Sequence, residues 1–270
     1  MDRAGLLGPA RRAELGAVLM HYVDVARELC ATAITILGTE PMRRAADADL
    51  VVEAIQLAAS ETLHVLSHEE EAFLTLIGVT AGRRVATAFG VIDVGGGSSE
   101  VALVAPGLPA YAAGIATGSS RLTTRFVEHD PPTLNEFAAL RAAARAAMVE
   151  APAGAPSELM AVGGTATNLL RVLPEAAHDG ILTRARLAEA QAVLAAEPTG
   201  EAAARHGVRL VRARILPAGA ALLDAFLEHY GLDELKVSDA GIREGAIVAQ
   251  RRAPVNWRAR LPALAEGWLR

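Results

Sequence analysis

The segment Val91-Ile-Asp-Val-Gly-Gly-Gly-Ser-Ser-Glu100 constrains the fold more than any other part of the chain. An apolar run ends at Asp93, three consecutive glycines follow at Gly95–Gly97, and a second alternating run starts at Glu100. This spacing predicts two strands, Val85–Asp93 and Glu100–Val104, joined by a glycine turn. A dinucleotide-binding turn, which joins a strand to a helix, is therefore excluded at this position.

The same segment predicts a phosphate site. Consecutive glycines let backbone N–H groups approach an anion closely, so Gly95, Gly96 and Gly97 are candidates for holding phosphate. Asp93 and Glu100 on the flanking strands have the oxygen ligands that bind a divalent cation. A plain hairpin turn also uses glycines, but it gains nothing from two inward-facing carboxylates, whose burial costs free energy.

Two other segments have the residues for phosphate chemistry. In Val162-Gly-Gly-Thr-Ala-Thr167 a strand meets a glycine pair at a helix start, where unpaired N–H groups favour an anion or nucleotide. Tight packing between strand and helix explains such glycines as well. Ser67-His-Glu-Glu-Glu-Ala72 places carboxylates in the first turn of a helix. They either orient water for attack on phosphorus or simply favour the positive end of the helix.

Basic residues have to supply any local attraction for a polyanion, because the net charge is -5 and the pI is about 5.8. Arginine binds phosphate bidentately, although most arginines only solvate a surface. Arg121, Arg209 and Arg243 are the best candidates because each adjoins a motif-like segment, and Arg43 is a further one. Other arginines considered are Arg44, Arg212 and Arg214.

The positions of the histidines and the single cysteine argue against zinc, acyl-enzyme and disulfide chemistry. The seven histidines form no pair at ligand spacing on one helix, and no serine lies in a nucleophile-elbow pattern, so neither zinc nor acyl-enzyme chemistry is expected. His68 and His129 remain candidates for auxiliary groups. The single cysteine, Cys30, excludes an internal disulfide; it is expected to be buried, and the cytoplasm is the expected compartment.

The order of elements predicts an α/β protein. The composition, 52% hydrophobic residues and 21% charged, is that of a globular chain. No apolar run is long enough for a membrane helix, and neither export nor membrane insertion is expected. Residues 151–157 and 197–207 are expected to be irregular. The expected strands are 31–37, 64–66, 85–93, 100–104, 111–115, 159–162 and 235–237, and the expected helices are 15–29, 49–60, 120–128, 134–148, 165–173, 184–194, 215–230 and 241–251.

Several segments taken in order resemble the exopolyphosphatase/guanosine pentaphosphate phosphatase (Ppx/GppA) family. The most specific are Arg121-Leu-Thr-Thr-Arg-Phe with His129-Asp-Pro-Pro-Thr133, and the segment Ser238-Asp-Ala-Gly-Ile-Arg-Glu-Gly245. The resemblance spans nearly the whole chain. The other similar segments are 38–44, 67–79, 91–100, 162–167 and 215–220.

The resemblance implies an actin-like ATPase or sugar-kinase (ribonuclease H-like) superfold with two lobes and a cleft. We expect a partial N-terminal lobe at residues 1–73, a C-terminal lobe at 74–250 and a helical tail at 251–270. It also implies a short-form enzyme in which water, assisted by Mg²⁺, removes the terminal phosphate of polyphosphate or guanosine pentaphosphate. Neither nucleic acid nor membrane is an expected partner, and a homodimer is suggested.

The resemblance also assigns roles to residues. Glu71 corresponds to the family's catalytic glutamate, and Asp93 and Glu100 are its partners for cation and water. The residues that would grip phosphate are Gly95, Gly96, Gly97 and Ser98, with Gly163, Gly164 and Thr165 lining the second lobe's side of the cleft.

Departures from the family pattern leave other readings open. Family members begin with a strand and a turn of the type Asp-x-Gly-Thr-Asn-Ser, whereas this sequence begins in the helix that should follow. His68 replaces a common glycine, and Phe73 stands where arginine is frequent. A catalytically impaired, regulatory binder of polyphosphate or alarmone is therefore the alternative function. A third hypothesis, that the protein is a sugar or acetate kinase of the same superfold, is supported by fold analogy alone.

Overall fold

The computed structural model describes residues 5–269 and divides the chain between Ser67 and His68 into two compact units. This boundary falls directly before helix α4 (His68–Thr80), so the division expected at residue 73 would cut through that helix. In the part of the chain that the structure describes, no helix is long and apolar enough to cross a membrane.

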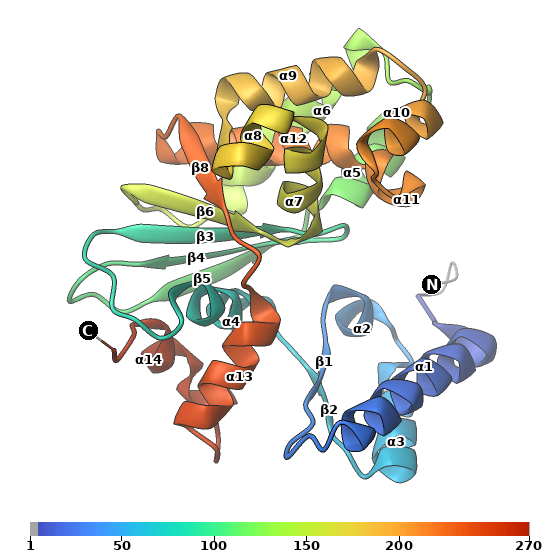
Figure 1. Cartoon of the computed structure of the whole chain (residues 1–270), viewed down its shortest axis with the longest axis vertical. Helices are drawn as coiled ribbons and strands as arrows, with labels where there is room; N and C mark the ends of the chain where they lie inside the picture. The colour runs from blue at the N-terminus through green and yellow to red at the C-terminus, as the bar shows by residue number, and fades with distance from the viewer. Residues whose placement is uncertain (1–4, 270) are drawn as a thin grey trace. The chain divides into compact units, whose positions relative to one another are not determined.

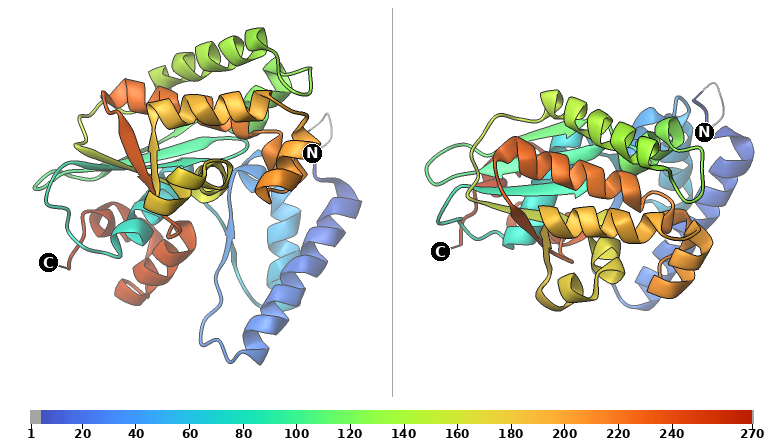
Figure 2. Two further views of the ribbon diagram at one scale, coloured as in Figure 1. Left: turned by 45° about the horizontal axis from the view of Figure 1, so that its top comes forward. Right: turned by 90° about the horizontal axis from the view of Figure 1, so that it is seen from above.

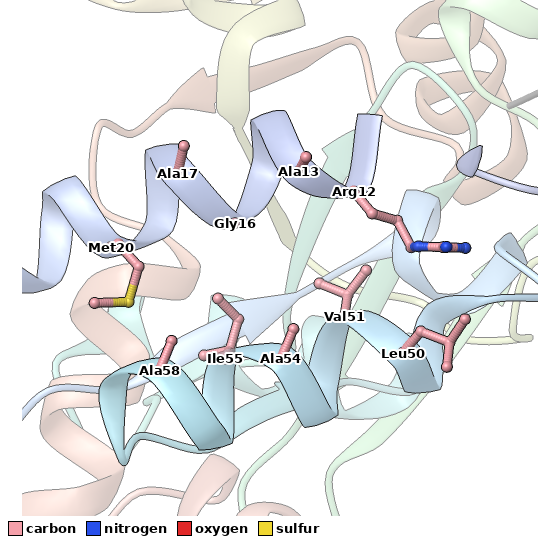
Figure 3. A pocket seen from close by; sticks show the side chains of 10 residues that line it. All are labelled: Arg12, Ala13, Gly16, Ala17, Met20, Leu50, Val51, Ala54, Ile55 and Ala58. Atoms are coloured by element: carbon pink, nitrogen blue, oxygen red, sulfur yellow. The ribbon is translucent and has the colours of Figure 1, made fainter. Parts of the chain in front are cut away.

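The first unit contains two parallel strands and three helices. Strands β1 (Ile36–Gly38) and β2 (Leu63–Val65) pair in parallel, and a small core includes Val23, Ile55 and Leu63. Mostly apolar residues of α1 and α3, among them Ala13, Met20, Leu50 and Ile55, line a hollow between these two helices (Figure 3). The helices are α1 (Gly8–Glu28), α2 (Glu40–Arg44) and α3 (Ala48–Ala59).

The second unit is built on a six-stranded mixed sheet with the order β5-β4-β3-β6-β8-β7. Strand β3 pairs antiparallel with β4 and parallel with β6, while β8 pairs parallel with β6 and antiparallel with β7. The strands are β3 (Phe89–Val94), β4 (Ser99–Val104), β5 (Tyr111–Ile115), β6 (Glu158–Val162), β7 (Ile181–Thr183) and β8 (Glu234–Val237).

Helices cover both faces of this sheet (Figure 1). On one face lie α4, α13 (Ile242–Arg252) and α14 (Leu261–Ala265). On the other face α12 (Leu216–Tyr230) runs between α6 (Leu134–Ala147) and α9 (Arg184–Ala195), as Figure 2 shows from above. The remaining helices are α5 (Ser119–Phe126), α7 (Gly163–Val172), α8 (Pro174–Asp179), α10 (Thr199–His206), α11 (Leu210–Ala213) and the short 3-10 turns Met148–Glu150 and Arg258–Arg260.

The α12 side of the sheet holds the larger hydrophobic core. Ile92 and Val94 of β3 and Val101 of β4 are buried in it, together with Leu222 and Phe226 of α12. Because side chains alternate along a strand, the residues between them point to the opposite face, which α4 covers.

A glycine contact fixes α4 against α13. A Cβ atom added at Gly78 would lie 2.0 Å from the Gly241 carbonyl oxygen, and one added at Gly245 would lie 1.8 Å from the Leu74 carbonyl oxygen. Any side chain at these positions would therefore force the helices apart. Helix α4 is held between the sheet and α13, which determines where its first turn lies.

Most expected elements are confirmed, although the helix expected at 15–29 begins at Gly8 and the strand expected at 85–93 begins at Phe89. Three further expectations were wrong. Residues 197–207 are not irregular, because α10 begins after Pro198 and ends at Gly207, which has φ 62°. Proline before a helix and glycine after it are the signals that should have identified it. Strand β1 is shorter than the expected 31–37. Cys30 is exposed, because α1 ends at Glu28 and Cys30 follows in a left-handed turn with φ 58°.

Candidate active site

Asp93 and Glu100 face each other across neighbouring strands. They are direct partners in the antiparallel register of β3 and β4, and Glu100 pairs on its other side with Gly114 of β5. Since Ile92 and Val101 point into the core on the α12 side, Asp93 and Glu100 point to the α4 side. The strand pairing thus brings together the two carboxylates that the sequence placed on either side of the glycines.

Helix α4 adds a third carboxylate. It packs across β3, β4 and β5, and Glu71 in its first turn is only 9% exposed. The negative charge of Glu71 acts on Asp93, so the two groups lie within electrostatic reach. The structure therefore gathers Glu71, Asp93 and Glu100 on one face of the sheet, within one unit.

The arrangement of the three carboxylates raises the pKa of Asp93. Burial raises its pKa to about 7, with further contributions from the charges of Glu100 and Glu71, while the Arg212 guanidinium opposes the shift. Burial and like charges disfavour an ionised carboxyl, and a cation close to it would reverse both effects. Such a perturbed carboxyl is typical of functional sites.

Hydrogen bonds from neighbouring side chains hold Glu100. Its Oε1 atom lies 2.7 Å from Nδ1 of His68 and accepts a hydrogen bond of 2.7 Å from the Ser98 hydroxyl. The residue is 3% exposed. Ser98, which was expected to grip phosphate, thus directs its hydroxyl to Glu100.

The glycine turn between β3 and β4 is braced by the start of α5. The Gly95 N–H donates to the Ser98 carbonyl oxygen at 3.0 Å, and the N–H groups of Ser119 and Ser120 donate to the carbonyls of Gly95 and Gly96. Among residues 5–269 we find no hydrogen bond donated by the N–H groups of Gly96 or Gly97. The carbonyls of Gly95 and Gly96 are fixed, while the N–H groups of Gly96 and Gly97 are available to an anion.

The second glycine turn lies against Asp93. Gly163 has φ 80°, which other residues rarely adopt, and a Cβ atom there would lie 2.4 Å from Oδ1 of Asp93. Gly163, Gly164 and Thr165 form the first turn of α7, whose N–H groups have no partner within the helix. The Thr165 hydroxyl donates to the Val94 carbonyl oxygen at 2.6 Å and is thus engaged within the protein.

The arginine candidates separate in the structure. The Arg212 guanidinium carbon would lie 3.4 Å from a Cβ atom at Gly164, and its charge acts on Asp93. Arg121 follows the start of α5, where its N–H donates to the Gly96 carbonyl oxygen and its side chain donates to the Ala116 carbonyl oxygen. Arg209 and Arg243 are exposed. Arg43 lies in the first unit and donates to the Leu66 carbonyl oxygen.

Sequence reasoning underestimated two residues. Arg212 was one of several basic residues, and nothing in its local pattern distinguished it from Arg209 or Arg214. His68 was only a candidate auxiliary group, although it directly precedes the three glutamates that start α4. His68 became identifiable from the register of β4 and β5, and Arg212 from its position beside Gly164.

The sheet and this site define an α/β protein in which two glycine turns present backbone N–H groups beside three carboxylates, an arrangement that suits a phosphate ligand. Comparison with known proteins narrows the class. The model of the Ppx/GppA phosphatase family matches residues 1–252, and the chain belongs to that family. The relatives that match it are named as exopolyphosphatases and guanosine pentaphosphate pyrophosphatases, which are hydrolases.

Relatives and solved structures agree with this assignment. The chain is 28% identical to "Exopolyphosphatase 2" of Mycobacterium tuberculosis, covering 91% of this chain and 83% of that protein. It is 24% identical to "Guanosine-5'-triphosphate,3'-diphosphate pyrophosphatase" of Vibrio vulnificus, covering 84% of this chain and 46% of that protein. The crystal structure of the Aquifex aeolicus family member superposes with a TM-score of 0.81 at 24% identity, covering 94% of this chain and 85% of that one. The predicted actin-like α/β fold is confirmed.

Proposed function

We propose that this protein removes the terminal phosphate of inorganic polyphosphate, of guanosine pentaphosphate or of both, by attack of water assisted by a divalent cation. The observation that carries the proposal is the gathering of Glu71, Asp93 and Glu100 on one sheet face, between two glycine turns. Phosphoryl transfer needs little covalent chemistry from the protein, and positioning with charge neutralisation suffices. With this function we also propose action in the cytoplasm and a homodimer.

Glu71 is the group proposed to activate water. Its carboxylate is buried in the first turn of α4, and the α13 contact fixes that helix. A carboxylate held in this way can accept a proton from the attacking water and orient its lone pair toward phosphorus. The reaction needs no covalent intermediate on the enzyme.

Backbone N–H groups are proposed to hold the phosphate. Gly96 and Gly97 present two of them, and the first turn of α7 at Gly163 and Gly164 presents others with the favourable helix dipole. Arg212 beside Gly164 adds a positive charge. We retain Arg43, Arg121, Arg209 and Arg243 as proposed contacts for the rest of a long polyanion.

Asp93 and Glu100 are the residues that would hold the cation. Across residues 5–269, no three His, Cys, Asp or Glu side chains are clustered as a ready-made metal site. Magnesium nevertheless fits, because it commonly keeps several waters and uses one or two carboxylates together with substrate phosphates. The raised pKa of Asp93 is the effect expected of an acidic site that lacks its countercharge. We propose Mg²⁺, which would neutralise charge on the phosphate oxygens.

Phosphate release tests the proposal. The full chain is incubated with long-chain polyphosphate or with guanosine pentaphosphate, in Mg²⁺ and in EDTA. We expect Mg²⁺-dependent release, and the ratio of kcat/KM values for the two substrates identifies the preferred one. Arg212→Ala should raise KM, whereas Arg214→Ala, at an exposed arginine two residues further on, should leave it close to the wild-type value.

Two negative outcomes have different meanings. Tight binding of either substrate without release would contradict hydrolysis and support a regulatory binder. Neither binding nor release would contradict the proposed substrate class altogether.

A further inference from the structure

A row of positions crosses the sheet at the candidate site. Asp93 of β3 pairs with Glu100 of β4, and Glu100 pairs with Gly114 of β5. The first two positions carry carboxylates on the α4 side, while the third has no side chain. The space above Gly114 is filled from α4 instead.

His68 fills that space. A Cβ atom added at Gly114 would lie 2.2 Å from Cγ and 2.5 Å from Nδ1 of the His68 ring. The imidazole therefore lies directly on the Gly114 backbone and can be there only because residue 114 is glycine. Its position as the first residue of α4, three residues before Glu71, connects the helix to the row of carboxylates.

The ring is directed at Glu100. Its Nδ1 lies 2.7 Å from Oε1 of Glu100, the same oxygen that accepts the Ser98 hydroxyl. Since an ionised carboxylate only accepts, Nδ1 is the protonated nitrogen of this hydrogen bond. Two donors on one oxygen, from α4 and from the glycine turn, fix the rotation of the carboxylate beside Asp93.

We propose that His68 is a positioning residue that orients the Glu100 carboxylate for the divalent cation and its phosphate. This inference rests on the proposed function. A partner that orients a ligating carboxylate typically changes metal affinity or activity by about 10- to 100-fold when it is removed. His68 itself touches neither water nor phosphorus in this role.

Four variants test the role: His68→Ala, His68→Asn, Gly114→Ala and the double variant His68→Gly/Gly114→Ala. Calorimetry measures Mg²⁺ affinity in the absence of substrate, and steady-state kinetics separates kcat from KM. We expect His68→Ala to weaken Mg²⁺ binding and lower kcat, each by roughly 10-fold or more, with little change in KM for polyphosphate. His68→Asn, whose amide nitrogen replaces Nδ1, should restore much of both.

Gly114→Ala provides the sharpest comparison. Its methyl group should displace the ring and reproduce the loss seen in His68→Ala, although the histidine is still present. In the double variant His68→Gly/Gly114→Ala, neither the ring nor the His68 Cβ atom, which would lie 2.3 Å from the new methyl group, remains. Its loss should therefore not exceed that of His68→Ala. His129→Ala is the matched control, because His129 also pairs with a glutamate, Glu136, at 3.0 Å but in an exposed loop. It should leave Mg²⁺ affinity and kcat unchanged.

The outcomes distinguish this inference from the proposed function. Unchanged Mg²⁺ affinity in both His68→Ala and Gly114→Ala, or additive losses in the double variant, would overturn the role of His68. If the wild-type chain binds Mg²⁺ but hydrolyses neither substrate, the proposed function fails, and the affinities alone still decide whether His68 orients Glu100.

Discussion

The end of β3 and the start of β4 present two carboxylates in direct register, yet their surroundings differ. Glu100 has hydrogen-bond partners at His68 and Ser98, whereas Asp93 is buried beside two negative charges with Arg212 as the cation acting on it. The first arrangement stabilises the folded protein and the second destabilises it. In the cation site that we propose, one carboxylate is thus fixed by hydrogen bonds and the other is short of positive charge.

The largest effects should come from neutralising each carboxylate without changing its shape. Asp93→Asn and Glu100→Gln should each lower phosphate release by about 100-fold or more, because both remove charge that would hold the cation. Their effects on stability in EDTA at pH 8 should have opposite signs. Glu100→Gln should destabilise by about 1–2 kcal/mol through weaker hydrogen bonds. Asp93→Asn should stabilise by on the order of 2 kcal/mol.

The pH dependence gives the sign of the Asp93 effect. Because its folded-state pKa is raised from 3.8 to about 7, the folded protein loses stability as the pH rises through this interval. The stability that Asp93→Asn adds to the folded protein should therefore be fully present above pH 7 and absent below about pH 4. Denaturant unfolding at several pH values measures it. If Asp93→Asn instead lowers stability at pH 8, the ionised Asp93 carboxylate does not destabilise the folded protein, and the contrast with the stabilising Glu100 is disproved.

Gly163→Ala tests whether Asp93 is also crowded. Gly163 and Gly180 both have positive φ, at 80° and 70°, but a Cβ atom meets Asp93 at 2.4 Å in the first case and nothing within 4 Å in the second. Gly180→Ala thus measures backbone strain alone. We expect Gly163→Ala to be more destabilising by about 1–3 kcal/mol, as judged by urea unfolding. Equal losses would mean that the carboxylate moves aside without cost.

A smaller effect is expected at a histidine–glutamate pair outside the site. Hydrogen bonding to Glu136 raises the pKa of His129; in turn, although burial would raise the pKa of Glu136, hydrogen bonds from Thr133, His129 and Glu128 lower it. The contribution of His129 to folding stability is fully present below its usual pKa of 6.5. The contribution of Glu136 is fully present above its usual pKa of 4.5. The stability difference between wild type and His129→Ala should therefore be greatest near pH 5.5 and shrink as the pH rises past 7. A difference that grows toward pH 8 would reverse this assignment.

The sequence predicted the elements of the site better than their contacts. Three glycines between two alternating runs identified the β3–β4 turn, although none of these glycines has a positive φ. Glu71 was identified from the family resemblance, since acidic residues at a helix start are common. The roles of His68 and Arg212 could not be predicted, because they depend on strand register and on which helix packs over Gly114 and Gly164. Ser98 and Thr165 were expected to face phosphate, but their hydroxyls bond within the protein.

The most direct test of the account compares two glutamates in the first turn of α4. Glu71→Gln removes the buried carboxylate proposed to activate water, while Glu69→Gln removes an exposed one two residues earlier. With saturating Mg²⁺ and polyphosphate, Glu71→Gln should lower kcat by about 100- to 10,000-fold with substrate binding preserved, and Glu69→Gln should stay near the wild-type rate. Wild-type kcat in Glu71→Gln would contradict the central claim that this carboxylate activates the attacking water.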